Sequence, residues 1–355
     1  MFFRVNCRKQ ITLLLLCLFS SSFPDCLAAT IDDAADLFTQ QQQEKNELEE
    51  MKQEMENIKG NMHDALNEMG KVQKMMSGSQ IREFHINAKE SSWEVFPGCT
   101  VNAVTYNNQV PGPVIRVSEG DQVKLVLHNA LKTSTSLYLH GMKLPHKVDG
   151  LPRKGGGLIG AGEGFVYQFI AEHPGTYWYH PQVPHYDQMQ KGLAGVIVVE
   201  PKSIPKTYER DFVIVISETN GAHSANATAK PPAQHRLNGV LFLANGKSAQ
   251  AIPPLEVRSG ERIRLRIVNA SSEACPLSLT GHRLEVVAQN GSDSIEPHVA
   301  RDTVTINAGE RMDLEFTADN PGVWSLSSLK ANQCSFNGAF PGGFAMVVRY
   351  PDLLK

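Results

Sequence analysis

The sequence predicts a mainly β protein in which one β-domain occurs twice, behind an N-terminal helical segment. Three observations predict it. From Ile81 onward, short alternating apolar and polar runs stand between Gly, Pro and Asn turns, the pattern of a sandwich or barrel. That pattern then recurs along the chain. Ahead of it lies a segment with apolar residues at heptad spacing.

The first residues of the chain have the features of a secretory signal peptide. Arg4, Arg8 and Lys9 make a basic start, "ITLLLLCLF" an apolar centre, and "CLAAT" a small-residue cleavage site near Ala29. The apolar run is short for a bilayer span, and no other long apolar run follows. We expect an exported protein, secreted or periplasmic in the bacterial cell envelope, with no membrane span after cleavage.

The composition allows sizeable cores and gives no reason to expect a nucleic-acid partner. The chain has 355 residues, of which 41% are hydrophobic, and a net charge of −3 at pH 7. Nucleic-acid binding normally needs an excess of basic residues. The length suits two or three domains.

The segment after the signal peptide predicts a coiled-coil helix. From Ile31 to Met76 it is rich in Gln, Glu, Lys and Met and contains no proline. Its apolar residues recur at alternating steps of three and four, which forms one seam along a helix. The seam residues are Leu48, Met51, Met55, Ile58, Met62, Ala65, Met69, Val72 and Met76. We expect oligomerisation through this seam; a copper-carrying methionine cluster is the alternative.

The β part contains an internal repeat, which predicts tandem domains. "VIRVSEGDQVKLVLHNA" at 114–130 is echoed by "PLEVRSGERIRLRIVNA" at 254–270. "HPGTYWYH" at 173–180 is echoed by "NPGVWSLS" at 320–327. The predicted division is a signal peptide at 1–29, a coiled-coil helix at 30–79, a first domain at 80–202 and a second domain at 203–355.

Several motifs resemble the multicopper oxidase family. "TYNNQVPGPVIRVSEGDQVKLVLHN", "LHGMKLPHKVDGLP" and "GTYWYHP" are similar to its first cupredoxin domain, and "DTVTINAGERMDLEFTADNPGVW" to its copper-bearing last domain. The resemblance covers residues 81–350. It implies an all-β fold of two tandem cupredoxin-like Greek-key β-sandwich domains, preceded by an N-terminal α-helical coiled-coil segment. Two-domain laccases and copper nitrite reductases are similar in plan and are trimers, so we favour a homotrimer.

The first-domain motifs keep half of the ligand histidines that the resemblance implies. The family's His-x-His-Gly is Tyr-Leu-His-Gly at 138–141, so His140 is present. Its His-x-His is His-Pro-Gln at 180–182, so His180 is present and Gln182 stands in place of the second histidine.

The second-domain motifs keep none of the implied ligands. His-Pro-x-His-x-His is Cys-Pro-Leu-Ser-Leu-Thr at 275–280, His-Cys-His is Ser-Ser-Leu at 327–329, and the next histidine is Gln333. Serine and leucine do not replace the thiolate and imidazoles around a type 1 copper. Without that copper, electrons from a reducing substrate have no entry point. We therefore expect laccase-like turnover to be lost.

A weaker metal interpretation rests on the two remaining histidines. By the resemblance, His140 and His180 match a pair that binds one copper. With a third donor from His185, or else from His146 or Met189, they could hold Cu(I) or Zn(II). The alternative is that both histidines only form hydrogen bonds within a former cavity.

Three cysteines remain after signal cleavage: Cys99, Cys275 and Cys334. A disulfide is permitted in an exported protein. By the resemblance, Cys275 stands at one type 1 ligand position and Cys334 beside another, and in the family those two loops meet at the copper. We therefore expect a disulfide between Cys275 and Cys334 and a free Cys99.

Three functions follow as hypotheses. The main one is a non-enzymatic, exported binding or assembly module, homo-oligomeric through its coiled coil, with a possible protein partner in the cell envelope and no catalytic residues. The second is a copper-binding protein with copper only at the residual site of His140 and His180. The third is a copper-dependent oxidoreductase with rearranged ligands.

Overall fold

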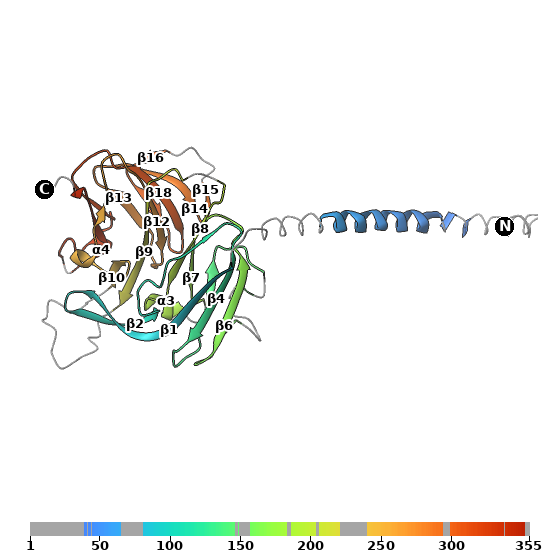
Figure 1. The fold of residues 1–355 in the computed structure, drawn as a ribbon, viewed down its shortest axis with the longest axis horizontal. Coiled ribbons are helices and arrows are strands. Elements are labelled where there is room, and N and C mark those ends of the chain that lie inside the picture. Colours follow the sequence, from blue (N-terminus) through green and yellow to red (C-terminus); the bar gives the residue numbers. More distant parts are fainter. Residues whose placement is uncertain are drawn as a thin grey trace, which may run out of the picture. The chain divides into compact units, whose positions relative to one another are not determined.

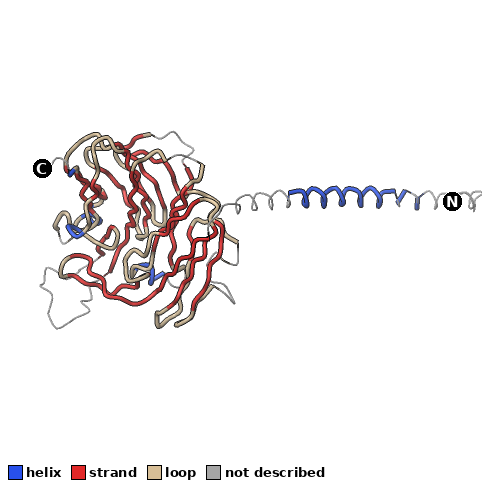
Figure 2. The backbone as a smooth tube through the Cα atoms, in the orientation of Figure 1, coloured by secondary structure: helices blue, strands red, loops and turns tan. Residues whose placement is uncertain are grey.

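The computed structural model consists mostly of β-strands, with few and short helices in its strand-rich part (Figure 1, Figure 2). The chain forms two compact units, Met1–Lys74 and Met75–Lys355. The prediction of a mainly β fold is confirmed. The predicted signal peptide at 1–29 lies outside the described residues. Those are 39–40, 42–43, 45–64, 81–145, 148, 157–182, 186–203, 206–220, 240–293, 299–336 and 338–351.

In the first unit, residues 45–64 are helical. The described seam residues are 48–59% exposed: Leu48, Met51, Met55, Ile58 and Met62. A coiled coil needs a second helix against this seam, so the pairing stays a prediction. The rest of the seam, from Ala65 to Met76, lies outside the described residues. Within the described part of the chain, every helix is too short or too polar to cross a membrane.

The first half of the second unit is a β-sandwich. Its elements are β1 (Ile81–Phe96), β2 (Cys99–Tyr106), β3 (Ile115–Ser118), β4 (Gln122–Asn129), β5 (Tyr138–His140), β6 (Gly164–Ile170), β7 (Gly175–His180), α3 (Tyr186–Gln190) and β8 (Gly195–Glu200). One sheet has the order β2-β1-β4-β6 and the other the order β3-β8-β7-β5. Side chains of both sheets share one buried core, in which Leu125 of β4 lies with Tyr179 and Ile197 of the second sheet.

The second half repeats the two-sheet plan. Its elements are β9 (Arg210–Asn220), β10 (Val240–Ala244), η2 (Ala249–Ala251), β11 (Leu255–Glu256), β12 (Arg262–Asn269), β13 (Cys275–Leu279), β14 (Leu284–Gln289), β15 (Ser292–Asp293), β16 (Ala300–Arg301), β17 (Val304–Ile306), β18 (Arg311–Thr317), β19 (Val323–Ser328), α4 (Ala331–Cys334) and β20 (Ala345–Arg349). One sheet runs β10-β9-β12-β18-β14-β15, with β16 beside β14, and the other β11-β20-β19-β13-β17. Leu265, Leu277 and Leu326 belong to the core between them.

The internal repeat is visible in the hydrogen bonds of equivalent asparagines. Asn129, the last residue of β4, donates from its side-chain amide to the carbonyl oxygens of Thr133, Ile159 and Gly160. Asn269 does the same at the end of β12, where it donates to the carbonyl oxygens of Glu273 and Ile306. A buried amide needs such partners, so both copies of the "N-A" sequence serve the same structural purpose.

The two halves pack on each other through the long β1–β2 hairpin of the first half. The β1–β2 hairpin contributes Val95 and Cys99 to an apolar cluster with Leu241 and Leu243 of β10. The Nε1 group of Trp93 donates to the carbonyl oxygen of Gly246 at 2.6 Å. Figure 1 shows this hairpin beside β10. The predicted division at residues 202 and 203 falls in the segment between β8 and β9.

Candidate functional site

The structure brings the two predicted metal ligands of the first half together. The strands β5 and β7 are antiparallel neighbours, with His140 opposite Trp178 and Tyr138 opposite His180. Side chains two residues apart on a strand share a face, so both imidazoles project on the same side. The Nδ1 atom of His140 lies 3.1 Å from the Nε2 atom of His180.

Aromatic rings enclose the histidine pair and keep it neutral. Trp178 stacks on His180 with ring centroids 3.9 Å apart, and Tyr138 meets His180 edge-on at 5.7 Å. Burial lowers the pKa of both histidines to about 4. A carbonyl oxygen only accepts, so the Nδ1 group of His180 donates to the carbonyl of Pro181 at 2.8 Å. The Nε2 atom of His180 is then the acceptor of the bond from His140.

A buried arginine of the second half lies against Gly141, the residue that follows His140. Arg311, at the start of β18, is 3% exposed, and its charge adds to the burial that lowers the pKa of both histidines. Its guanidinium lies against Gly141, the residue after His140. A Cβ atom at position 141 would overlap that guanidinium, and Gly141 has a φ of +84°. Both facts require glycine at this position.

The other predicted donors do not join the pair. His185 and His146 lie outside the described residues. Met189 of α3 is 4% exposed and packs among apolar residues with Trp178. The backbone N–H of Gln182 donates to the hydroxyl of Ser136 at 3.0 Å. Among the residues that the structure describes, no three His, Cys, Asp or Glu side chains are grouped closely enough to hold a metal ion.

The second-half positions that resemble type 1 ligands also meet, as a buried hydrogen-bonded cluster. Cys275 of β13, Ser328 of β19 and Gln333 of α4 are 0–2% exposed. The Ser328 hydroxyl donates to the Oε1 atom of Gln333 at 2.6 Å, and Cys275 is hydrogen-bonded to Ser328. The Nε2 group of Gln333 donates to the carbonyl of Ala274 at 3.1 Å. Burial raises the pKa of the Cys275 thiol to about 11.

The predicted disulfide is not formed in the structure. Cys275 and Cys334 are free, buried thiols, as is Cys99. Each sulfur of the predicted pair has a different partner: Cys275 bonds to Ser328, while the Sγ atom of Cys334 lies 3.9 Å from the carbonyl of Ala331 within its own helical turn. The two loops meet as the resemblance implies, but their sulfur atoms are engaged separately.

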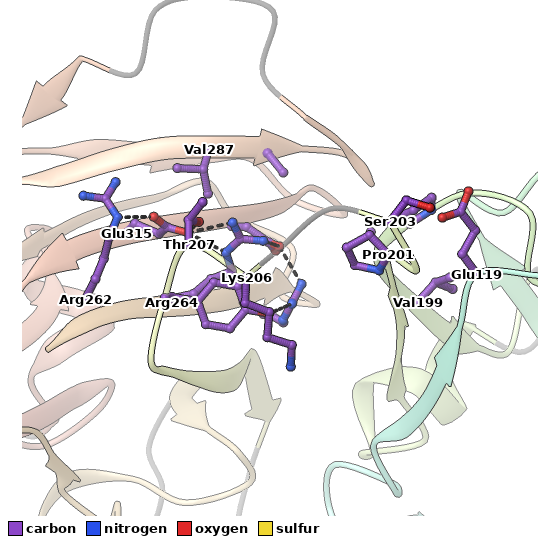
Figure 3. A pocket seen from close by; sticks show the side chains of 16 residues that line it. Glu119, Val199, Pro201, Ser203, Lys206, Thr207, Arg262, Arg264, Val287 and Glu315 are labelled. Atoms are coloured by element: carbon purple, nitrogen blue, oxygen red, sulfur yellow. Dashed lines mark hydrogen bonds and ion pairs between the residues drawn. The ribbon is translucent and has the colours of Figure 1, made fainter.

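A pocket of about 980 Å³ lies between the segment after β8 and one face of the seven-stranded sheet (Figure 3). Arg262, Arg264 and Arg266 line it together, because alternate residues of β12 share a face. Arg264 donates to Glu315 at 2.6 Å, and Arg262 also bonds Glu315, as Figure 3 shows. The guanidinium groups of Arg262 and Arg264 are thus already paired with carboxylates of the same half.

Arg266 lies at the centre of this charged network. It donates to Asp211 at 2.6 Å, to Asp313 at 2.7 Å and to the hydroxyl of Tyr208 at 2.8 Å. The hydroxyl of Thr176, on β7 of the first half, donates to Asp313 at 2.6 Å. The network therefore joins the two halves through groups that are almost entirely buried.

Comparison with known proteins agrees with this architecture. Two family models, each described as multicopper oxidase, match residues 87–204 and 208–342. The chain belongs to the multicopper oxidase family. The family predicted from the sequence motifs is thereby confirmed.

Its relatives in the multicopper oxidase family include Multicopper oxidase MmcO of Mycobacterium tuberculosis, which is 30% identical over 262 residues, or 65% of this chain and 51% of that protein. Copper resistance protein A of Escherichia coli is 28% identical over 55% of this chain and 40% of that protein. The chain thus spans about half the length of the curated relatives it matches.

Solved multicopper oxidases share the fold. The blue copper oxidase of Nitrosomonas europaea superposes with a TM-score of 0.70 at 27% identity, covering 78% of this chain and 87% of that one. The copper nitrite reductase of the same organism has a TM-score of 0.62 at 25% identity, covering 76% of this chain and 94% of that one. These similarities support a cupredoxin-like fold for both halves.

Sequence reasoning missed three residues of the site: Trp178, Arg311 and Arg266. The alternation in "RIRLRIVN" was a usable signal for Arg266, because it places three arginines on one face of a strand. Arg311 gives no such signal, since the groups it contacts are distant in the sequence.

Proposed function

We propose that this chain is an exported, multicopper-oxidase-like protein that has lost its type 1 and trinuclear copper centres and acts as a binding or assembly module. The observation that carries the proposal is the buried cluster of Cys275, Ser328 and Gln333. A type 1 centre needs a thiolate and imidazoles. The cluster offers one thiol with a raised pKa, and its polar groups are bonded to one another.

The histidine pair fits part of a copper site. His140 and His180 would hold the ion through these two nitrogen atoms, which lie 3.1 Å apart. This spacing favours copper binding at a residual site as the second candidate function. Two imidazoles are fewer donors than copper or zinc usually takes from a protein, and Arg311 adds a positive charge beside them. The described residues therefore do not fit a complete copper centre.

After copper loading, the protein is expected to be colourless and to hold at most one weakly bound copper per chain. The intense blue band of type 1 copper requires a thiolate bond, and Ser328 stands at the thiolate position. Absorption spectra and metal analysis on the mature protein check this. His140→Ala and His180→Ala should each abolish whatever copper is held, because either imidazole alone is a poor site.

The same preparation separates the remaining alternatives. Oxidation of a phenolic substrate or reduction of nitrite by the copper-loaded protein would support an oxidoreductase with rearranged ligands. A blue band, or several tightly held coppers per chain, would contradict the loss of the copper centres.

Export and tandem domains belong to the same proposal. The basic start and apolar centre of residues 1–29 support a signal peptide that directs the protein to the periplasm or out of the cell. The division at 80–202 and 203–355 is supported by the family matches at 87–204 and 208–342.

Assembly is proposed to occur through the helix of the first unit. An isolated helix with an exposed apolar seam has little to stabilise it, so pairing with other copies would bury that seam. The mature protein is expected to be a homotrimer, and a shortened chain beginning at Ser79 a smaller species. Light scattering measures both masses, and monomer masses for both chains would contradict the proposal.

Point variants make this test independent of truncation. Ile58→Glu places a charge in the seam and should lower the oligomer mass, whereas Gln53→Glu, on an exposed non-seam position of the same helix, should not. A protein partner in the cell envelope that binds the same seam would appear as a heteromeric complex instead.

A further inference from the structure

The guanidinium of Arg311 is fixed beside the histidine pair by backbone carbonyl groups. Its Nε group donates to the carbonyl of Thr176 at 3.2 Å, and a terminal nitrogen donates to the carbonyl of Asn290 at 2.6 Å. Thr176 belongs to β7, the strand that ends at His180, and Asn290 follows β14. Arg311, which is 3% exposed, is thus hydrogen-bonded to both halves.

The charge of Arg311 is poorly compensated. Arg266, on the neighbouring strand β12, forms ion pairs with Asp211 and Asp313 at 2.6 and 2.7 Å. In the described part of the chain, by contrast, none of the ion pairs involves Arg311, although Asp313 and Glu310 act on it from a distance. Its bonds to the carbonyl oxygens of Thr176 and Asn290 use two of its five N–H donors and leave its positive charge in place.

We infer that Arg311 is a built-in cation that excludes divalent metal ions from the His140–His180 pair, which is otherwise a latent two-imidazole metal site. The two nitrogen atoms already have a spacing that one ion could bridge. An incoming divalent ion would have to approach a fixed positive charge in a buried environment, where water and salt screen repulsion weakly. In the absence of the ion, the two imidazoles satisfy each other by a hydrogen bond.

This inference rests on the proposed loss of the copper centres and would account for the weak metal binding expected at the remaining pair. It assigns the exclusion to one side chain from the opposite half of the molecule. The position of that side chain in turn depends on Gly141, where any Cβ atom would overlap the guanidinium.

Titration of the mature protein with Cu(II) and Zn(II) tests the inference. Arg311→Gln removes the charge and keeps an amide donor near the position of the Nε group, which donates to Thr176. It is expected to bind either ion about tenfold more tightly than the unmodified protein, or more. Arg311→Lys keeps the charge and alters the same hydrogen bonds, so its affinity should stay at the level of the unmodified protein. Isothermal titration measures the affinities.

Electron paramagnetic resonance identifies the ligands of the bound Cu(II). In Arg311→Gln the spectrum should show coupling to imidazole nitrogen, and the gain in affinity should vanish when His140→Ala or His180→Ala is added. Melting temperatures establish which variants are folded, and Arg311→Met is the second neutral variant should Arg311→Gln not fold.

Three outcomes would overturn the inference: tight binding at the pair in the unmodified protein, no gain in a folded neutral variant, or an equal gain in Arg311→Lys. The first uses the unmodified chain and does not depend on any variant folding. A blue band or several tight coppers in the unmodified protein would instead overturn the proposed function. A colourless protein with no gain in Arg311→Gln would overturn the inference alone.

Discussion

Arg266→Ala is expected to lower the free energy of unfolding by about 3–5 kcal/mol. Arg266 is 2% exposed, and its removal leaves the carboxylates of Asp211 and Asp313 without their closest common cation. An uncompensated charge that is buried costs more than the ion pair contributes. Because Thr176 of the first half bonds to Asp313, the loss should also loosen the contact between the halves.

Chemical denaturation followed by tryptophan fluorescence measures this effect. The matched control is Arg283→Ala, which removes an arginine from an exposed pair with Asp302 (63% and 82% exposed) and should cost about 1 kcal/mol or less. Arg266→Met keeps the packing of the side-chain stem. It should still lower the free energy of unfolding by most of the amount expected for Arg266→Ala. Equal effects for Arg266→Ala and Arg283→Ala would show that the buried network does not stabilise the fold.

Between pH 7 and pH 4, the free energy of unfolding is expected to fall by about 3 kcal/mol on account of His180. Its pKa is lowered from 6.5 to about 4 by burial, and it is 3% exposed. In this pH range, His180 is therefore protonated in the unfolded chain and neutral in the folded chain. The contribution of His180 to the free energy of unfolding is fully present above pH 6.5 and is lost as the pH falls toward 4.

His180→Gln, which cannot titrate, is the control for this pH dependence. The double variant with His140→Gln should have a still flatter profile, because the pKa of His140 is lowered to about 4 as well. His282 of the second half, whose pKa is also lowered by burial, contributes to any pH dependence of the unfolding free energy that persists in the double variant. Parallel profiles for the unmodified protein and both variants would contradict the predicted role of the pair.

The sequence motifs predicted which residues of the histidine pair and of the Cys275 cluster lie close together, because the order of strands brings the motifs side by side. "YLH" and "TYWYH" end two strands that pair, so His140 and His180 were predictable neighbours once the family was recognised. In the same way, the resemblance placed Cys275, Ser328 and Gln333 at positions of type 1 ligands, and the structure brings them together. The disulfide predicted at that place is absent, because orientation of a side chain follows from its local partners and not from the proximity of two loops.

The sequence by itself determined the mainly β fold, the repeated domain and the family, because alternation, turn residues and motif order are local properties of the chain. It also determined which residues stand at the motif positions that resemble copper ligands. Only the tertiary structure decided what surrounds the remaining histidines. Arg311 of β18 bonds to Thr176 of β7, and Arg266 of β12 bonds to Thr176 of β7 and to Asp313 of β18. Such contacts depend on how two sandwiches pack, and packing brings together residues that no local pattern relates.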